Sequence, residues 1–232
     1  PARAATYYQR AAAQSRSAFD LAGCIDRAKR ALVLGPTEDH KLCAAELLAD
    51  AHGWRFEWAA AMPYIETILV LTEPGCTAFC TALAYKVTAA LLLMRPAELM
   101  EGIATAQALE PAAEGDIPMA LQAIATAVVA LCLMAQRDAA AALLAKIDAL
   151  AGDRKETDPL VRGQWHLAHI YPHVWGGQDP WAVFEHARAA RAAFLEVGEI
   201  RSAMYARSYE ALARARLGDP EQAERDLAEM PR

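Results

Sequence analysis

Alanine constrains the fold of this chain more than any other residue type. It supplies 55 of the 232 positions, and it has the highest helix propensity of the amino acids. Strands favour β-branched and aromatic residues, and aromatic residues make up only 7% of the sequence. Small side chains also let helices approach closely, while larger apolar residues fill the gaps. The sequence therefore predicts an all-α fold of closely packed helices.

Helix boundary signals recur along the chain at steps of about 33 to 46 residues, the range of helical-hairpin repeats. Asp158, Asp179 and Asp219 each precede a proline, as in a helix whose N-cap aspartate is followed by proline at the first helical position. We expect one domain over residues 1–232 with six antiparallel helix pairs, at residues 2–36, 38–74, 77–111, 116–152, 158–198 and 199–230. The expected helices are 2–16 with 18–34, 38–53 with 56–73, 77–94 with 96–109, 116–136 with 138–151, 158–177 with 180–197, and 199–217 with 219–230.

Several of these segments resemble the tetratricopeptide repeat (TPR) family. In 31–36 and 106–111 an alanine lies five positions before a proline, 217–223 reads Leu-Gly-Asp-Pro-Glu-Gln-Ala, and 167–171 carries Leu-Ala-x-x-Tyr. The resemblance implies a right-handed α-α superhelix, a TPR-like solenoid, whose first helices line a concave groove that binds a protein, a peptide or a small effector. Most first helices lack the aromatic and glycine pair of the family, so the repeat boundaries are open.

A narrower resemblance concerns bacterial regulators. The opening segment 4–12 and the segment 187–230 are similar to helical regions that accompany a STAND-type ATPase module, joined to a Ser/Thr kinase or to a LuxR-type DNA-binding end. That resemblance implies a scaffold or sensor role in signalling or transcription regulation. The chain begins at Pro1 without Met, and we expect it to be a piece of a longer protein.

The sequence argues against several functions. A net charge of −6 disfavours binding to phosphate backbones. There is no Gly-x4-Gly-Lys-Ser/Thr loop, kinase glycine loop, Gly-x-Ser-x-Gly elbow or His-Glu-x-x-His helix. We therefore expect a binding module that is not an enzyme, with no cofactor and no metal. Its five scattered cysteines fit buried thiols in a reducing cytoplasm. The uncharged stretch 117–135 is expected to be a buried helix rather than a membrane span.

The most suggestive group of side chains is Arg162, Trp165, His166, His169 and His173. Spacings of three, four and seven place the arginine and the histidines on one helical face. Three interpretations stay open. The rings pack between neighbouring hairpins, they bind an acidic or aromatic ligand in the groove, or the imidazoles hold a metal in a third, enzymatic alternative. Proline at position 172 breaks the helix, so the last histidine can leave the face.

A second group lies on the next expected first helix. Glu210 and Arg214 have the i, i+4 spacing of a solvated ion pair, contributing about 0.2–0.5 kcal/mol. Alternatively, Arg207 and Arg214, one heptad apart, present their guanidinium groups to a carboxylate of a partner.

The aromatic residues Trp54, Phe56 and Trp58 crowd one expected turn. They either pack between hairpins or, where exposed, form an interface. The second possibility supports an alternative function, a homotypic oligomerisation domain or homodimer without a specific ligand. Cys76 and Cys80 are expected to be buried thiols, since a structural zinc site needs four ligands.

Overall fold

The computed structural model describes residues 2–35, 37–177 and 179–228. Within these residues it contains thirteen α-helices and no β-strand, which confirms the predicted all-α class. The chain divides into two compact units, Pro1–Asp116 and Ile117–Arg232, and each is described by itself. The predicted end of the first pair at Pro36 and the predicted end of the last helix at residues 229–230 lie outside the described residues.

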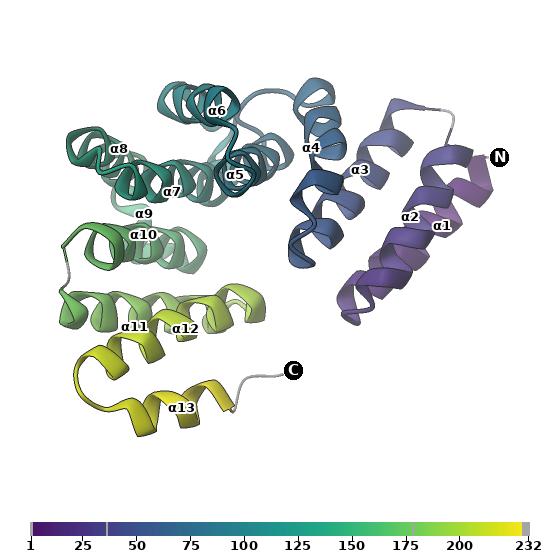
Figure 1. The fold of residues 1–232 in the computed structure, drawn as a ribbon. Helices are drawn as coiled ribbons and strands as arrows, with labels where there is room; N and C mark the ends of the chain where they lie inside the picture. Colours follow the sequence, from purple (N-terminus) through teal and green to yellow (C-terminus); the bar gives the residue numbers. More distant parts are fainter. Residues whose placement is uncertain (1, 36, 178, 229–232) are drawn as a thin grey trace. The chain divides into compact units, whose positions relative to one another are not determined.

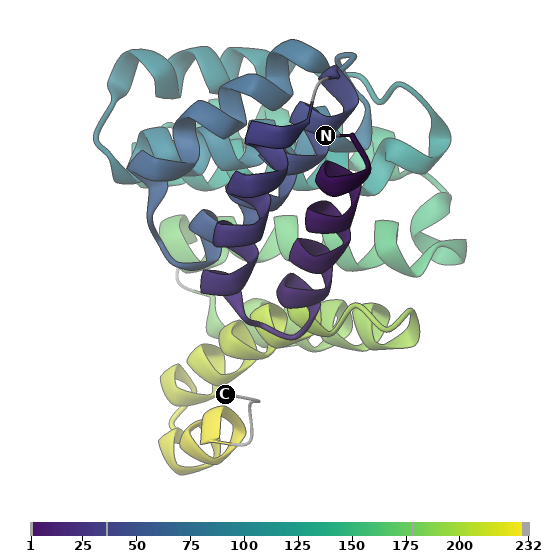
Figure 2. The ribbon, with the colours of Figure 1, turned by 90° about the vertical axis from the view of Figure 1, so that its right-hand side faces the viewer.

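Unit 1 is a series of helices in which each packs against the next along the chain. Figure 1 shows α1 and α2 side by side, followed by α3 and α4, and Figure 2 shows the antiparallel course of α1 and α2. Alanines and a few larger residues such as Leu48, Ile65 and Leu83 fill its interior. The elements are α1 (Ala2–Ser17), α2 (Leu21–Leu34), α3 (Glu38–Trp54), α4 (Trp58–Leu71), α5 (Thr77–Leu92), α6 (Pro96–Ala108) and the short 3₁₀ helix η1 (Glu114–Asp116).

Unit 2 begins with α7, which packs against both α8 and α10, and continues through α11 and α12 to α13. It contains one short helix, α9, that the sequence analysis did not predict. Residues 152–157 were expected to be a connection, whereas Arg154–Thr157 form a single helical turn that is followed by Asp158, the cap of α10. The elements are α7 (Ile117–Leu133), α8 (Arg137–Ala151), α9 (Arg154–Thr157), α10 (Pro159–Pro172), the π-helical turn η2 (His173–Gly177), α11 (Pro180–Glu196), α12 (Ile200–Arg216) and α13 (Pro220–Ala228).

One turn geometry recurs six times, after α1, α3, α5, α7, α11 and α12. In each turn a backbone N–H donates to the carbonyl five residues earlier at 2.8–3.0 Å, and the preceding N–H donates to the carbonyl three residues before it. This pattern is the Schellman motif, which places one residue in the left-handed region. These turns join successive helices of a helical-repeat-like, all-α fold. The left-handed residues are Phe19, Phe56, Met94, Ala135, Gly198 and Gly218.

The predicted aspartate caps are present. The Asp158 carboxylate accepts hydrogen bonds from the backbone N–H groups of Leu160 and Val161, at 2.8 and 3.3 Å. Asp179 caps α11 in the same way at 3.1 Å, and Asp219 accepts from the third residue after it at 3.2 Å. These caps begin the helices at the residues that the Asp-Pro pairs indicate.

Close helix contact in unit 2 depends on small residues. The buried residues shared by α11 and α12 include Ala187, Ala190, Ala203 and Ala206, all with no exposed surface. On α10, Gly163 faces the fully buried ring of Phe194, and a Cβ atom at this glycine would lie 2.6 Å from that ring. The missing side chain therefore sets the distance between α10 and α11.

The apolar stretch at the start of unit 2 is largely buried. Glu114–Leu133 is, among the described residues, the one helical segment long and apolar enough to cross a membrane, and 61% of its most apolar window is buried inside the protein. Twelve residues of α7 are buried. The predicted burial of this helix is confirmed, as is typical of a core helix flanked by others.

Candidate functional site

Four rings gather between α10 and α11 and form what we call the histidine cluster: Trp165, His166, His169 and His186. The first three come from α10, where spacings of one, three and four residues place them on adjoining parts of one face. His186 comes from α11, which packs against α10. Ring centroids lie 4.4 Å apart for Trp165 and His169, and 5.2 Å apart for His166 and His186.

A single carboxylate joins two of these rings. Asp148 of α8 accepts a hydrogen bond from Trp165 Nε1 at 2.6 Å, and its Oδ1 atom lies 3.0 Å from His169 Nε2. The Lys155 ammonium lies 4.8 Å from the centroid of the Trp165 ring, within the range of a cation–π contact. The cluster therefore already holds one carboxylate and one cation from the chain itself.

His166 and His186 face each other through like atoms. Their Nδ1 atoms are 2.9 Å apart, and a hydrogen bond at this distance needs one donor and one acceptor. At least one of the two imidazoles is therefore neutral. A second proton would place two N–H groups against each other and break the contact.

The electrostatics of the cluster follow from partial burial. Burial, followed by the neighbouring charges of His186 and His169, lowers the pKa of His166 to about 4. Burial, followed by His169 and His173, lowers the pKa of His186 to about 4. For Asp148, burial acts to raise the pKa, but hydrogen bonds from Trp165 and His169 outweigh it and the pKa is lowered. Near neutral pH the facing pair is uncharged and the carboxylate is ionised.

Arg162 and His173, the remaining members of the predicted group, are not among the four rings of the cluster, although the charge of each acts on one of its histidines. Arg162 Nη2 pairs with Glu196 at the end of α11. Pro172 ends α10, as predicted, and His173 begins the π-helical turn η2. Trp175, in the same turn, is 47% exposed. The face predicted from spacing thus divides between an ion pair at Arg162, the histidine cluster, and a last histidine that lies beyond the end of α10.

A metal interpretation gains no support from the geometry. Among residues 2–35, 37–177 and 179–228, no three His, Cys, Asp or Glu side chains are arranged to hold a metal ion.

The second predicted group, on α12, differs from its prediction. Glu210 was expected to make a solvated ion pair, but its side chain is only 5% exposed. Arg191 of α11 donates from Nε to Glu210 Oε2 at 2.9 Å, and Arg214 Nη2 lies 3.4 Å from Oε1. The prediction was wrong about exposure because residue spacing on one helix does not reveal the arginine that α11 places over it.

Arg207 and Arg214 also contact the terminal helix. Asp226 of α13 lies 3.9 Å from Arg207 Nη2 and 3.1 Å from Arg214 Nε. Within the chain, the two arginines therefore already hold a carboxylate.

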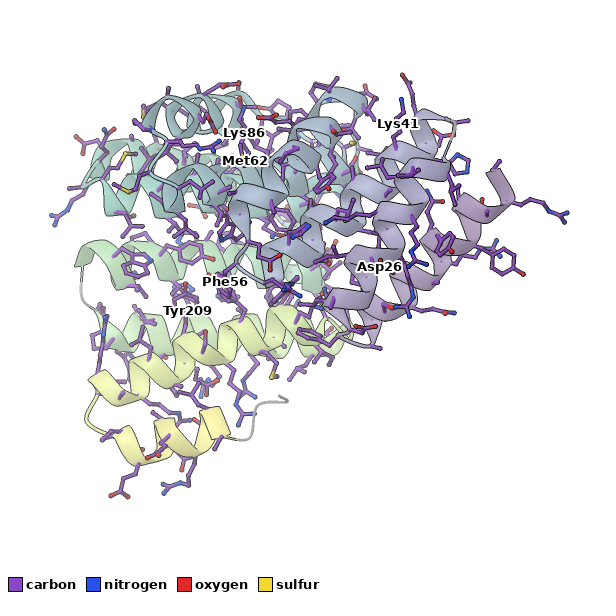
Figure 3. All side chains as sticks on the ribbon, turned by 45° about the vertical axis from the view of Figure 1, so that its right-hand side comes forward. Asp26, Lys41, Phe56, Met62, Lys86 and Tyr209 are labelled. Carbon is purple, nitrogen blue, oxygen red and sulfur yellow. The ribbon has the colours of Figure 1, made fainter. Side chains whose placement is uncertain are left out.

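The aromatic turn between α3 and α4 divides into a packed and an exposed part. Trp58 packs into the core of unit 1, where its ring and that of Tyr85 meet edge to face with centroids 6.0 Å apart. Trp54 is 40% exposed, and the centroid of its ring lies 6.0 Å from that of Phe19. Phe56, labelled in Figure 3, is 78% exposed. We call Phe19, Trp54 and Phe56 the turn patch, since all three lie at the tight turns that follow α1 and α3.

Cys80 is buried, and burial, followed by the Cys76 thiol, raises its pKa to about 12. Cys76 is only half-buried, and its Sγ atom caps α5 by accepting from Phe79 N at 3.5 Å. The expectation of two buried thiols therefore holds for one of them, because the helix start keeps the other near the surface. All five cysteines are free.

Unit 1 carries an open hollow of about 370 Å³ between α2 and the start of the α3–α4 turn. Three of its lining side chains pair with one another: His52 Nδ1 lies 2.7 Å from Glu57 Oε2, and Arg55 Nε donates to the other oxygen of Glu57 at 2.8 Å. Asp26 and Lys29 of α2 also line the hollow, which therefore carries both signs of charge. We prefer the histidine cluster as the candidate site, because more aromatic and ionisable side chains converge there.

Sequence reasoning missed Asp148, Lys155 and His186. Each lies on a different helix from the predicted stripe, and no local spacing connects them to it. The chain was compared with protein-family models, with curated proteins and with solved structures, and none of the three comparisons gave a match.

Proposed function

We propose that the protein is a non-catalytic binding module that recognises an acidic segment of a partner protein at the histidine cluster. The observation that carries the proposal is the arrangement around Asp148, whose carboxylate accepts from both an indole and an imidazole. The same surface carries Lys155 and the partly exposed Trp165. Asp148 fixes the indole and the His169 ring in place, and the Lys155 ammonium over the Trp165 ring supplies a cation that can form a charge-assisted hydrogen bond with an acidic side chain.

Binding rather than chemistry fits the states of these groups. The facing imidazoles of His166 and His186 satisfy each other, and burial keeps them neutral near pH 7. A neutral aromatic surface with cationic groups at its edge favours stacking and hydrogen bonding with aromatic and acidic side chains. The TPR-like resemblance supports the same role, since helical-repeat arrays present extended surfaces to peptides.

Selection of random 12-residue peptides displayed on phage against the purified chain would test the proposal. Enriched peptides should be acidic, and their affinity should fall by at least about tenfold in Trp165→Ala and His169→Ala, which remove about one hot-spot contact each. Trp181→Ala is the matched control, because this exposed tryptophan lies on α11 outside the histidine cluster. Failure to enrich acidic peptides, or equal binding by Trp165→Ala, would contradict the proposal.

The resemblance to STAND-type regulators extends the proposal to cytoplasmic signalling or transcription control in bacteria. In that setting, a segment bound here would bias the activity of a fused ATPase, kinase or DNA-binding module. In a protein that joins this chain to such a module, deletion of residues 1–232 should abolish this control, and unchanged regulation would contradict the extension.

Self-association is a second candidate, favoured by the turn patch. Exposed aromatic side chains are enriched at interfaces, and Phe56 is 78% exposed. Sedimentation velocity over a wide concentration range would show a dimer that Phe56→Ser weakens. A monomer at all concentrations would remove this candidate.

A further inference from the structure

The terminal helix α13 is attached to α12 mainly through charge. Figures 1 and 2 show α13 folded back from α12 after a tight turn. Ala223 is its one buried residue among those described, and Leu227 is 47% exposed. Asp226, by contrast, lies against Arg207 and Arg214 with its side chain only 17% exposed. An apolar contact this small contributes little, so the ion pairs carry much of the attachment.

The arginine side of this contact is organised independently of α13. The Arg214 guanidinium lies 4.9 Å from the centroid of the Phe184 ring and next to Glu210, which Arg191 also holds. A guanidinium placed by an aromatic ring and a buried carboxylate keeps its direction when the other partner leaves. The surface is therefore a preformed carboxylate site.

The charge balance of the site changes when α13 leaves. With α13 in place, the Asp226 carboxylate lies 3.9 Å from Arg207 and 3.1 Å from Arg214, beside the pair that Glu210 forms with Arg191 and Arg214. When α13 leaves, this surface loses the negative charge of Asp226. Losing that charge is unfavourable unless another anion replaces it, and this requirement favours an acidic occupant over a neutral one.

We propose that Arg207 and Arg214 form a second binding surface, which α13 covers within the chain and which an acidic helix of a partner protein occupies by displacing α13. The geometry of α13 defines what the partner helix must carry. Like Ala223 and Asp226 of α13, it needs a small residue that packs against α12 and, three residues later, a carboxylate that pairs with the arginines. This surface lies on helices other than α8–α10 and does not depend on the function proposed for the histidine cluster.

A labelled peptide tests the proposal with the full chain. The probe is a fluorescein-labelled synthetic peptide with the sequence of residues 217–232, and the measurement is fluorescence anisotropy. Asp226→Arg repels α13 from both arginines and should leave the surface open. We expect this variant to bind the peptide at least about tenfold more tightly than the unmodified chain, with an affinity that falls as salt rises. A peptide with asparagine in place of its aspartate at position 226 should bind weakly.

Glu224→Arg is the matched control, because this exposed residue makes the same charge reversal on α13 outside the arginine contact. Equal peptide binding by this control and Asp226→Arg would overturn the proposal. So would equal binding of the asparagine peptide, or no binding to a variant whose far-ultraviolet circular dichroism is unchanged.

Hydrogen exchange separates displacement of α13 from loss of the fold. In Asp226→Arg, the amides of α13 should exchange faster while those of α10 and α11 stay protected. Faster exchange throughout α10–α12 would show that α13 belongs to the core of unit 2 and would overturn the proposal. The charge-swapped variant Arg214→Asp/Asp226→Arg should restore protection of α13, and failure to restore it would count against the assigned ion pair.

Discussion

At the scale of single residues, the six tight turns differ in how well their sequence suits their backbone. Gly198 and Gly218 adopt positive φ without a steric penalty, whereas Phe19, Phe56, Met94 and Ala135 adopt φ of 55–61° with a side chain present. For an L-residue this conformation costs about 1–2 kcal/mol. The four substituted turns therefore form because the surrounding hydrogen bonds and helix packing outweigh a local strain.

Ala135→Gly should increase the free energy of unfolding by about 0.5–1 kcal/mol, because it relieves that strain and the greater freedom of glycine in the unfolded chain offsets only part of the gain. Urea unfolding followed by circular dichroism provides the measurement. The same substitution at Ala145, an exposed position within α8, should lower stability by about 1 kcal/mol. A lower midpoint for Ala135→Gly than for the unmodified chain would refute the argument.

The residue scale also shows where sequence reasoning succeeds. The caps at Asp158 and Asp179 were predictable, because a cap depends on residues two or three positions away. The contacts of Asp148 and His186 were not predictable. Asp148 lies 21 positions from His169, His186 lies 20 positions from His166, and in each pair the two residues lie on separate helices. The exposure of Glu210 was mispredicted for the same reason, since Arg191 reaches it from 19 residues earlier.

At the scale of elements, the contact between α10 and α11 depends on one absent side chain. Gly163→Ala adds a better helix former, yet its Cβ atom would lie 2.6 Å from the Phe194 ring. We expect the free energy of unfolding to fall by about 1–3 kcal/mol, the range for an overpacked core. Thermal unfolding would measure it, and Phe194→Leu in the same chain should recover part of the loss. A stabilised Gly163→Ala variant would mean that the two helices separate easily.

The same pair of helices should make stability depend on pH. The pKa of His166 and of His186 is about 4 in the folded chain, against 6.5 as the ordinary value. Between these pH values the unfolded chain binds more protons than the folded chain does. The contribution of these histidines to the free energy of unfolding is therefore fully present above about pH 6.5 and declines as the pH falls towards 4. Each histidine changes the free energy of unfolding by at most about 1.4 kcal/mol per pH unit.

Urea unfolding at pH 7, 6 and 5 would measure this decline. The double variant His166→Gln/His186→Gln should lose most of it, while His40→Gln, in unit 1, should retain it. If the double variant and the unmodified chain decline equally between pH 7 and 5, the facing histidines are not the groups responsible.

At the scale of the whole molecule, the all-α class was predictable because alanine content and proline spacing both act through local helix formation. The helix boundaries agree within a few residues, apart from α9. The division into two units was not predicted, because the break at Asp116 follows a 3₁₀ turn that resembles the other connections in sequence.

The burial of α7 leads to a prediction at the same scale. Twelve of its seventeen residues are buried within the protein, and the accessible face mixes apolar and polar residues, namely Met119, Gln122, Thr126, Val129 and Leu133. In flotation with phosphatidylcholine vesicles we expect the purified chain to stay in the dense fraction. Ala125→Arg, which places a charge at a buried position, should reduce the folded fraction without affecting flotation. Recovery of the unmodified chain with the vesicles would contradict this assignment.

The recurring turn has a consequence for how such a chain can change over generations. Its hydrogen bonds join only main-chain atoms, and phenylalanine, methionine, alanine and glycine all occupy the same position. Mutation can therefore replace the residues of a turn while the hairpin keeps its shape. Hairpins of this kind can therefore diverge widely in the sequence of their turns while the angle between their two helices is kept.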